Sequence, residues 1–114
     1  MHESSLTEDL FAHAMQHARE ARAARVTRVR VLIGALSDAT PESIRFYFDT
    51  MAAGTIAEGA RLEFECTPGK AHCQSCGEDV DIEELFGTCP CCGEFALTVI
   101  GGNAVYLESV EVQL

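Results

Sequence analysis

CQSCGEDVDIEELFGTCPCCG, residues 73–93, contains five of the six cysteines of this chain. Cys73 and Cys76 are separated by two residues, as are Cys89 and Cys92, and twelve residues lie between the two pairs. Two matched pairs at this spacing favour one shared zinc ion in an intracellular protein. Residues 71–95 are rich in cysteine, glycine and acids and poor in apolar residues, so we expect a metal to hold them.

The position of glycine selects four ligands from the five cysteines. Gly77 follows Cys76 and Gly93 follows Cys92. A glycine directly after the second ligand lets the backbone turn tightly, so that amides can point at sulfur. This offset selects Cys92 and leaves Cys91 as a free thiol near the site. Four thiolates fill a tetrahedral zinc and leave no open position, so the predicted site is structural.

Two residues near the pairs, and the first pair itself, have other possible roles. Cys66 is predicted to be a small hydrophobic side chain of a strand. His72 adjoins Cys73 and could tune or replace a ligand. A redox dithiol formed by Cys73 and Cys76 would instead make the protein an oxidoreductase, but two matched pairs favour a shared metal.

Composition excludes several classes of protein. The chain has 114 residues and a formal net charge of −10, so it would repel nucleic-acid phosphates. It has no run of about 18 apolar residues, and we expect no membrane span. The beginning MHESSLTEDL lacks the basic and apolar regions of an export signal, so we expect a cytoplasmic protein.

Two helices are predicted in the first half of the chain. Ser5 and Glu8 have the spacing of a capping box. The apolar face of the helix that follows consists of Leu6, Leu10, Ala14, Ala18 and Ala21. A second helix has Thr40 at the cap position, Pro41 in its first turn and Gly54 at its end. Its apolar face consists of Ile44, Phe48, Met51 and Ala52.

Strands are predicted at 26–36, 61–66, 96–100 and 104–114. The last two flank the turn signal GGN and predict a hairpin. In the last strand, Val105 and Leu107 lie on one phase and Val110 and Val112 on the other. Such a slip implies a bulge or a change of partner sheet. A strand that leaves the metal-binding part and returns to the N-terminal part would explain it.

Charged and histidine residues elsewhere have ordinary interpretations. Residues 78–84 are acidic and are expected to form a solvated loop. His13 and His17 stand four apart in HAMQH, which lacks the glutamate of a zincin pair, so we expect boundary residues of the first helix. Five basic residues are interpreted as favouring a helix C-terminus, with a docking patch for an acidic partner as the alternative: Arg19, Arg22, Arg25, Arg28 and Arg30.

The N-terminus is a candidate site for a second metal. The terminal amine, the first backbone amide and the imidazole of His2 can chelate one ion, and Glu3 could complete a planar set. Nitrogen-rich planar geometry favours nickel(II) or copper(II) over zinc. A histidine at position two is otherwise an ordinary solvated residue.

Three segments together resemble the HypA/HybF family of nickel-incorporation chaperones: MHE at 1–3, VTRVRVLIGALSDATPESIRFYFD at 26–49, and the CxxCG…CPxCG pair. The similarity extends through GTIAEGARLEF and VYLESVEV. It implies a small two-lobe α+β fold. An α/β nickel-binding lobe, with two helices on a three-stranded sheet, would comprise residues 1–66 and the strand 108–114. A zinc-ribbon lobe would comprise 67–107.

The resemblance also implies a function and its partners. Family members hand nickel to the large subunit of NiFe hydrogenase and work with a GTPase. The nickel ligand corresponds to His2, and the zinc ligands correspond to Cys73, Cys76, Cys89 and Cys92. Such a protein binds and delivers metal and needs no catalytic residues. The alternative is a zinc-ribbon adaptor that binds only protein, in which MHE is incidental.

Overall fold

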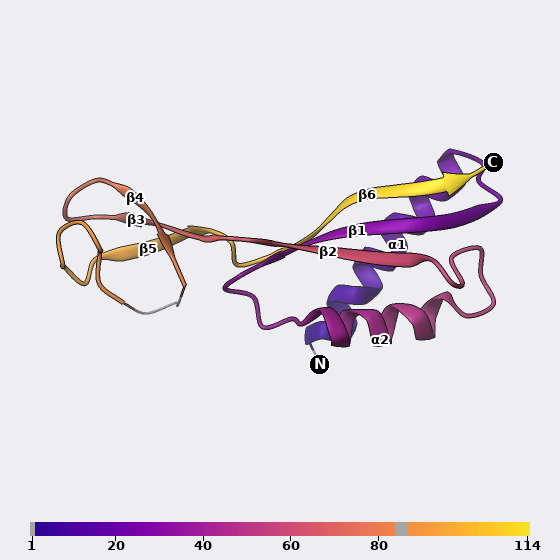
Figure 1. Cartoon of the computed structure of the whole chain (residues 1–114), viewed down its shortest axis with the longest axis horizontal. Helices are drawn as coiled ribbons and strands as arrows, with labels where there is room; N and C mark the ends of the chain where they lie inside the picture. The colour runs from indigo at the N-terminus through magenta and orange to yellow at the C-terminus, as the bar shows by residue number, and fades with distance from the viewer. Residues whose placement is uncertain (1, 84–86) are drawn as a thin grey trace. The chain divides into compact units, whose positions relative to one another are not determined.

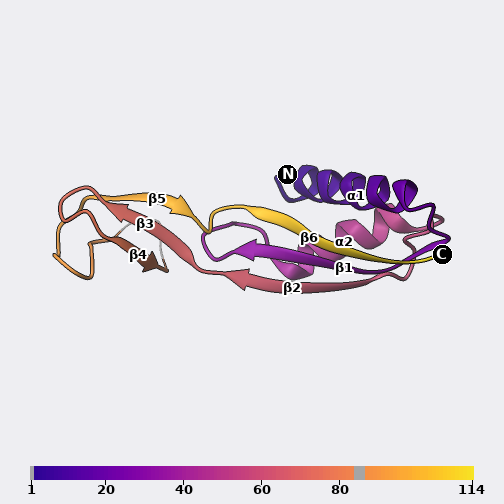
Figure 2. The same cartoon turned by 90° about the horizontal axis from the view of Figure 1, so that it is seen from above.

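The computed structural model describes residues 2–83 and 87–114, and of residues 2 and 3 only the backbone. Two helices and six strands are described, and Figures 1 and 2 show how the strands lie side by side within each sheet. Their bounds are α1 (His2–Glu20), β1 (Arg25–Gly34), α2 (Pro41–Ala52), β2 (Arg61–Thr67), β3 (Gly69–Cys73), β4 (Asp79–Ile82), β5 (Leu97–Gly101) and β6 (Val105–Gln113). The strands form two three-stranded sheets, with orders β2-β1-β6 and β4-β3-β5. The predicted α+β class, with two helices beside a three-stranded sheet, is confirmed.

The chain divides into two compact units, each built from separate segments. Unit 1 comprises Met1–Leu32, Asp38–Glu65 and Val105–Leu114. Unit 2 comprises Ile33–Ser37 and Cys66–Ala104. The returning C-terminal strand is confirmed, because β6 is hydrogen-bonded to β1 in the sheet of unit 1.

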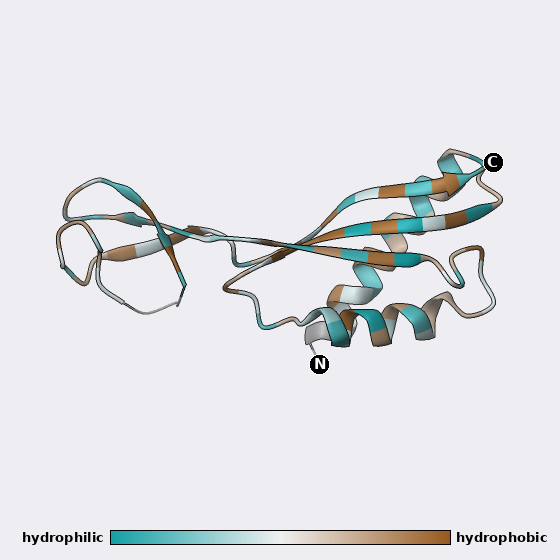
Figure 3. Ribbon diagram, viewed as in Figure 1, coloured by the Kyte–Doolittle hydropathy of each residue, from teal (hydrophilic) through white to brown (hydrophobic). Residues whose placement is uncertain are grey.

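Unit 1 has a core of small and aliphatic side chains between its helices and its sheet. Helix α1 packs against α2 and β6 and buries Leu10, Ala14 and Ala18. Figure 3 shows apolar and polar residues alternating along β1, where Val29 and Val31 are buried. The alternation follows from the two-residue period of a strand with one covered face. No described helix combines the length and the apolar character needed to cross a membrane.

Helix α1 begins earlier than the capping box predicts. It starts at His2, so Ser5 lies inside the helix rather than at its cap, and that prediction is wrong. The residues between them include no proline or glycine, so nothing stops the helix from gaining another turn. The helix ends at Glu20, and Ala21 lies beyond it as an exposed residue, outside the apolar face to which it was assigned.

The C-terminus of α1 is closed by a backbone motif that usually contains glycine. Arg22 has a φ of 55°, in the left-handed region. The Ala23 amide donates to the Ala18 carbonyl at 2.9 Å, and the Arg22 amide donates to the Arg19 carbonyl at 3.0 Å. These are the two bonds of a Schellman motif, with Arg22 where glycine is commonest.

Helix α2 has the predicted bounds. Thr40 is extended, and its hydroxyl accepts a hydrogen bond from the Ser43 amide at 3.2 Å. Pro41 occupies the first turn, where a missing amide hydrogen costs nothing. Gly54 follows the helix with a φ of 79°, a conformation that suits glycine.

The predicted hairpin of the last two strands is wrong. β5 pairs with β3 in unit 2, whereas β6 pairs with β1 in unit 1. The residues between them bond instead to the end of β1 and the segment after it, since the Gly34 amide donates to the Ala104 carbonyl and the Leu36 amide to the Gly102 carbonyl. The expected phase slip appears within β6, where Glu108 and Ser109 are both exposed.

Three backbone segments of unit 2 meet at glycines. A Cβ atom on Gly102 would lie 2.2 Å from the Pro68 carbonyl oxygen, and one on Gly34 would lie 2.2 Å from the Gly102 carbonyl oxygen. Atoms cannot approach this closely, so both positions require the absence of a side chain.

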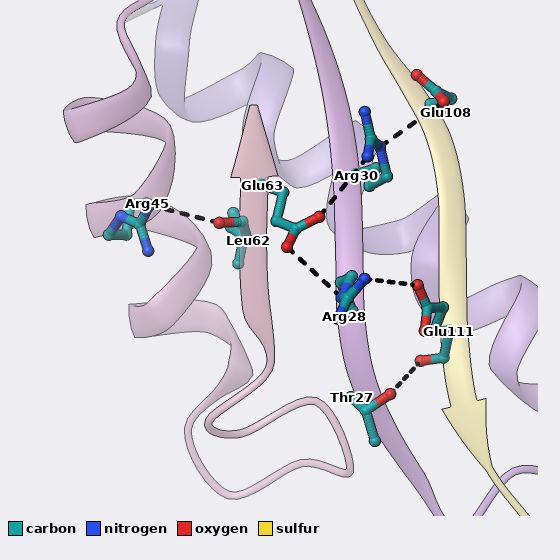
Figure 4. Close-up of polar contacts among 8 residues, drawn as sticks. All are labelled: Thr27, Arg28, Arg30, Arg45, Leu62, Glu63, Glu108 and Glu111. Atoms are coloured by element: carbon teal, nitrogen blue, oxygen red, sulfur yellow. Dashed lines mark hydrogen bonds and ion pairs between the residues drawn. The ribbon is translucent and has the colours of Figure 1, made fainter. Parts of the chain in front are cut away.

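The solvent face of the unit 1 sheet carries a network of ion pairs. Arg28 on β1 lies 3.6 Å from Glu63 on β2 and 3.2 Å from Glu111 on β6. Arg30 lies 3.8 Å from the same Glu63 and 3.7 Å from Glu108, and Figure 4 shows both arginines between the acids of the flanking strands. These two arginines therefore pair with the sheet's own acids and do not lie at a helix C-terminus, which corrects their interpretation.

Replacing Arg22 with glycine should stabilise unit 1. The left-handed conformation costs roughly 1–2 kcal/mol for a residue with a side chain, whereas glycine adds about 0.5–1 kcal/mol of backbone entropy. We expect Arg22→Gly to raise the free energy of unfolding by about 0.5–1 kcal/mol in denaturant titrations. Ala23→Gly, one residue further on, should lower it, and an Arg22→Gly variant no more stable than the parent would contradict the assignment.

Candidate metal centre

The first cysteine pair forms a tight turn at the end of β3. The Gly77 amide donates to the Cys73 carbonyl at 2.9 Å, and the Cys73 amide donates to the Glu78 carbonyl at 2.9 Å. The Cys76 amide points at the Cys73 sulfur, 3.4 Å away. Gly77 has a φ of 79°, which explains the glycine after the second cysteine.

The second cysteine pair repeats this turn. The Gly93 amide donates to the Cys89 carbonyl at 2.8 Å, and the Cys89 amide donates to the Glu94 carbonyl at 2.9 Å. The Cys91 amide points at the Cys89 sulfur, 3.4 Å away, and Gly93 has a φ of 76°. Cys91 thus contributes a backbone amide to the second turn.

The two turns bring four sulfur atoms together. The Sγ atoms of Cys73, Cys76, Cys89 and Cys92 all lie within 4.8 Å of one another. Cys73 and Cys92 are 3.7 Å apart, and Cys76 and Cys89 are 3.8 Å apart. Zinc–sulfur bonds of about 2.3 Å in a tetrahedron require sulfur atoms about 3.8 Å apart. The donor set therefore fits a tetrahedral ion of this size.

The protonation of the four thiols also favours a cation. The Cys76 amide lowers the pKa of Cys73, and the Cys92 amide lowers the pKa of Cys89 to about 7. At Cys76, the Glu78 amide lowers the pKa, but burial and the neighbouring thiols outweigh it and raise the value to about 12. Four adjacent thiolates repel one another, so a divalent cation is needed to hold all four deprotonated.

Three nearby candidates lie outside this group. The thiol of Cys91 is exposed, and desolvation raises its pKa. Cys66 lies in β2, as predicted, and its side chain is exposed. His72 places Nδ1 2.7 Å from Asp79 Oδ1, across the β3–β4 pair, and is not a member of the four-sulfur group.

A small apolar cluster surrounds the two inner cysteines. Ala71 and Val80 are buried with Cys73 and Cys89, and the partly buried residues packed against them are Ile82, Ala96 and Leu97. Most of this cluster comes from β3 and β4, two strands that were not predicted from the sequence. The alternation of Val80 and Ile82 with acidic neighbours was the signal for β4, but it lay within a run interpreted as a loop.

His2, the predicted nickel ligand, is the first residue of α1. Met1 and the side chains of His2 and Glu3 lie outside the described residues.

The fold and the site together define a class of protein. It is an α+β protein with two helices, two small sheets and a four-cysteine cluster. The chain belongs to the HypA family, since the family described as "Hydrogenase/urease nickel incorporation, metallochaperone, hypA" matches residues 1–112. The family resemblance of the sequence is thereby confirmed.

Individual relatives and solved structures agree with this membership. The chain is 42% identical over 113 residues to the hydrogenase maturation factor HypA of Albidiferax ferrireducens, covering 99% of this chain and 100% of the relative. It is 41% identical over 112 residues to HypA 2 of Bradyrhizobium diazoefficiens, covering 98% and 99%. The solution structure of the Ni metallochaperone HypA from Helicobacter pylori matches with a TM-score of 0.72 at 25% identity, covering 97% of each chain. A second HypA solution structure matches with a TM-score of 0.74 at 26% identity, covering 98% of this chain and 96% of that one.

Substitution of single cysteines should separate the ligands from the bystander. Cys76→Ser removes one of four converging sulfurs, so we expect loss of tightly bound zinc. Cys91→Ser leaves the four-sulfur group intact and should retain one zinc per chain. Zinc content after dialysis against a mild chelator measures both, and equal loss in the two variants would show that the ligand set is wrong.

Removal of zinc should unfold unit 2 before unit 1. The core of unit 1 consists of aliphatic side chains and the Phe11–Phe48 ring pair, and none of its buried residues is a cysteine. We therefore expect α1 and α2 to persist in circular dichroism after chelation at 25 °C, while hydrogen exchange accelerates in β3 and β4. A complete loss of helical signal would mean that the units fold as one.

Proposed function

We propose that this chain is a nickel metallochaperone that binds nickel(II) at its N-terminus and delivers it to the large subunit of NiFe hydrogenase. The observation that carries the proposal is membership of the HypA family over residues 1–112, together with a four-cysteine cluster suited to a separate, structural metal. The partner in delivery is a nickel-handling GTPase of hydrogenase maturation. The protein acts in the cytoplasm.

Zinc in the four-cysteine cluster has a structural role in this proposal. Its ligands are Cys73, Cys76, Cys89 and Cys92, whose four sulfurs leave no position for water or substrate. Zinc would compensate the negative charge of the four thiolates. It would also hold the two turns in place, one at the end of β3 and the other before β5. A closed site of this kind supports binding and delivery rather than an enzyme.

Nickel in this proposal binds donors of residues 1–3. The terminal amine, the His2 amide and the His2 imidazole form the chelate, and Glu3 can complete it. Helix α1 begins at His2, and the first amides of a helix have no acceptor within the helix. The backbone nitrogens that nickel would use are thus not committed to hydrogen bonds of the helix.

The two metals are assigned to different lobes. Residues 1–66, completed by 108–114, form the nickel-binding lobe, and residues 67–107 form the zinc-binding lobe. This separation lets the cargo exchange without disturbing the metal that maintains the fold of the second lobe.

A protein-binding adaptor with zinc alone is the second candidate. The exposed aromatic and aliphatic side chains Phe95 and Ile100 on unit 2 favour it, because they offer apolar contact area. The adaptor would bind one zinc and no nickel, so metal stoichiometry separates the two functions.

Nickel binding should require both His2 and a free terminal amine. We expect His2→Ala to abolish high-affinity nickel binding in calorimetric titrations of the zinc-loaded protein. Adding one residue before Met1 should be nearly as damaging, because it moves the amine out of chelating reach. Binding should also weaken as pH falls from about 8 to 6, since the amine and the imidazole must both release protons.

The matched control is His72→Gln, which alters an imidazole in unit 2 and should leave nickel affinity unchanged. Equal high-affinity nickel binding by the parent, His2→Ala and the extended chain would favour another nickel site. Absence of any high-affinity nickel binding by the parent would favour the adaptor.

A further inference from the structure

Helix α1 presents two histidines to a groove within unit 1. His13 and His17 are both exposed and lie one helical turn apart. They line a groove of about 430 Å³ between α1 and β6, whose other lining residues are Leu6, Asp9, Leu10, Val105, Tyr106 and Leu107. The groove therefore brings two imidazoles to one accessible hollow.

We propose that His13 and His17 form a second site for a divalent metal ion of the nickel and copper class. Side chains four residues apart on a helix have Cβ atoms about 5–6 Å apart, so two imidazoles can reach one ion. Imidazole nitrogens suit nickel, copper and zinc, and copper and nickel generally bind more tightly than the earlier divalent ions. The site goes beyond the proposed function, because it requires neither His2 nor the terminal amine.

The missing glutamate of HAMQH does not argue against binding. In the zincin pattern two histidines at this spacing bind the metal, whereas the glutamate acts as the general base of hydrolysis. Its absence removes the chemistry and leaves the pair of ligands. HAMQH therefore keeps the two ligand positions of the pattern and lacks its general base.

A carboxylate lies beside one of the two imidazoles. Glu20 Oε1 is 3.7 Å from His17 Nδ1, longer than a hydrogen bond. Metal-binding histidines commonly have a carboxylate near the ring nitrogen that does not bind the metal. Among the described residues, the His13 imidazole has no side-chain hydrogen bond or ion pair, so no such contact holds its ring away from His17.

The surroundings favour a cation that exchanges readily. The carboxylate of Asp9 lines the same groove. Within the described residues, however, no third carboxylate, thiol or imidazole converges with the pair as the four cysteines do. Water would fill the remaining positions, so an ion there should be held more loosely than one in a complete cage.

The test uses the zinc-loaded, untagged full chain carrying His2→Ala, so that the four-cysteine cluster is filled and the N-terminal chelate is removed. Titration with nickel chloride should reveal one remaining, weaker binding event. Adding His13→Gln or His17→Gln to this background should weaken it by at least about 100-fold, because either change destroys the chelate. Adding His72→Gln should have no effect.

A second measurement detects the bound ion through its effect on thermal stability. An ion that bridges two side chains one turn apart on α1 stabilises the folded protein. The melting temperature of the His2→Ala protein should therefore rise as the nickel concentration is increased, and adding His17→Gln should abolish that rise. Retained binding in both double variants, or no binding in the His2→Ala background, would overturn the inference. Absence of binding in the His2→Ala background would be compatible with the proposed N-terminal nickel site. A parent that binds nickel only through His13 and His17 would refute the proposed function and support this second site.

Discussion

Four sulfur atoms within 4.8 Å of one another are the constraint on which unit 2 depends. Left alone, this arrangement is unfavourable, because thiolates repel one another and burial disfavours their charge. Backbone amides of the two turns lower the pKa of Cys73 and Cys89, and a divalent cation would complete the compensation. The same turns set the start of the neighbouring structure, since the Gln74 amide donates to the Ala96 carbonyl next to β5. The sheet of unit 2 thus extends from its sulfur cluster.

Unit 1 is held together by the packing of apolar side chains. Alanines at positions 14 and 18 let α1 approach its neighbours closely, and Val29 and Val31 fill the covered face of β1. On the open face, two arginines of β1 neutralise acids of both flanking strands. These contacts involve no thiol, in contrast to the core of unit 2.

Local chemistry predicted much of the fold and of the four-cysteine cluster, but not the pairing of distant segments. Thr40 and Pro41 fix the start of α2 through bonds within a few residues, and the spacing of Cys73 and Cys76 specifies a turn. The hairpin expectation failed because partner choice for β6 is set by β1, far away in the sequence. The role of Arg28 was missed for the same reason, since its acids lie on other strands. The His2 side chain lies outside the described residues, so its assignment stays a prediction.

The connectivity of unit 1 has a consequence for how the chain matures. Its sheet cannot be completed until β6 is synthesised, and most of unit 2 emerges from the ribosome before that strand. Within unit 2, the Ala35 amide bonds to the Thr67 carbonyl and the Gly34 amide bonds to the Ala104 carbonyl, so both ends of the inserted segment are held beside one short stretch. A folded insertion therefore behaves as an already closed loop, which reduces the entropy cost of bringing β6 to β1. The supply of metal to unit 2 during synthesis would then influence how fast unit 1 completes its sheet.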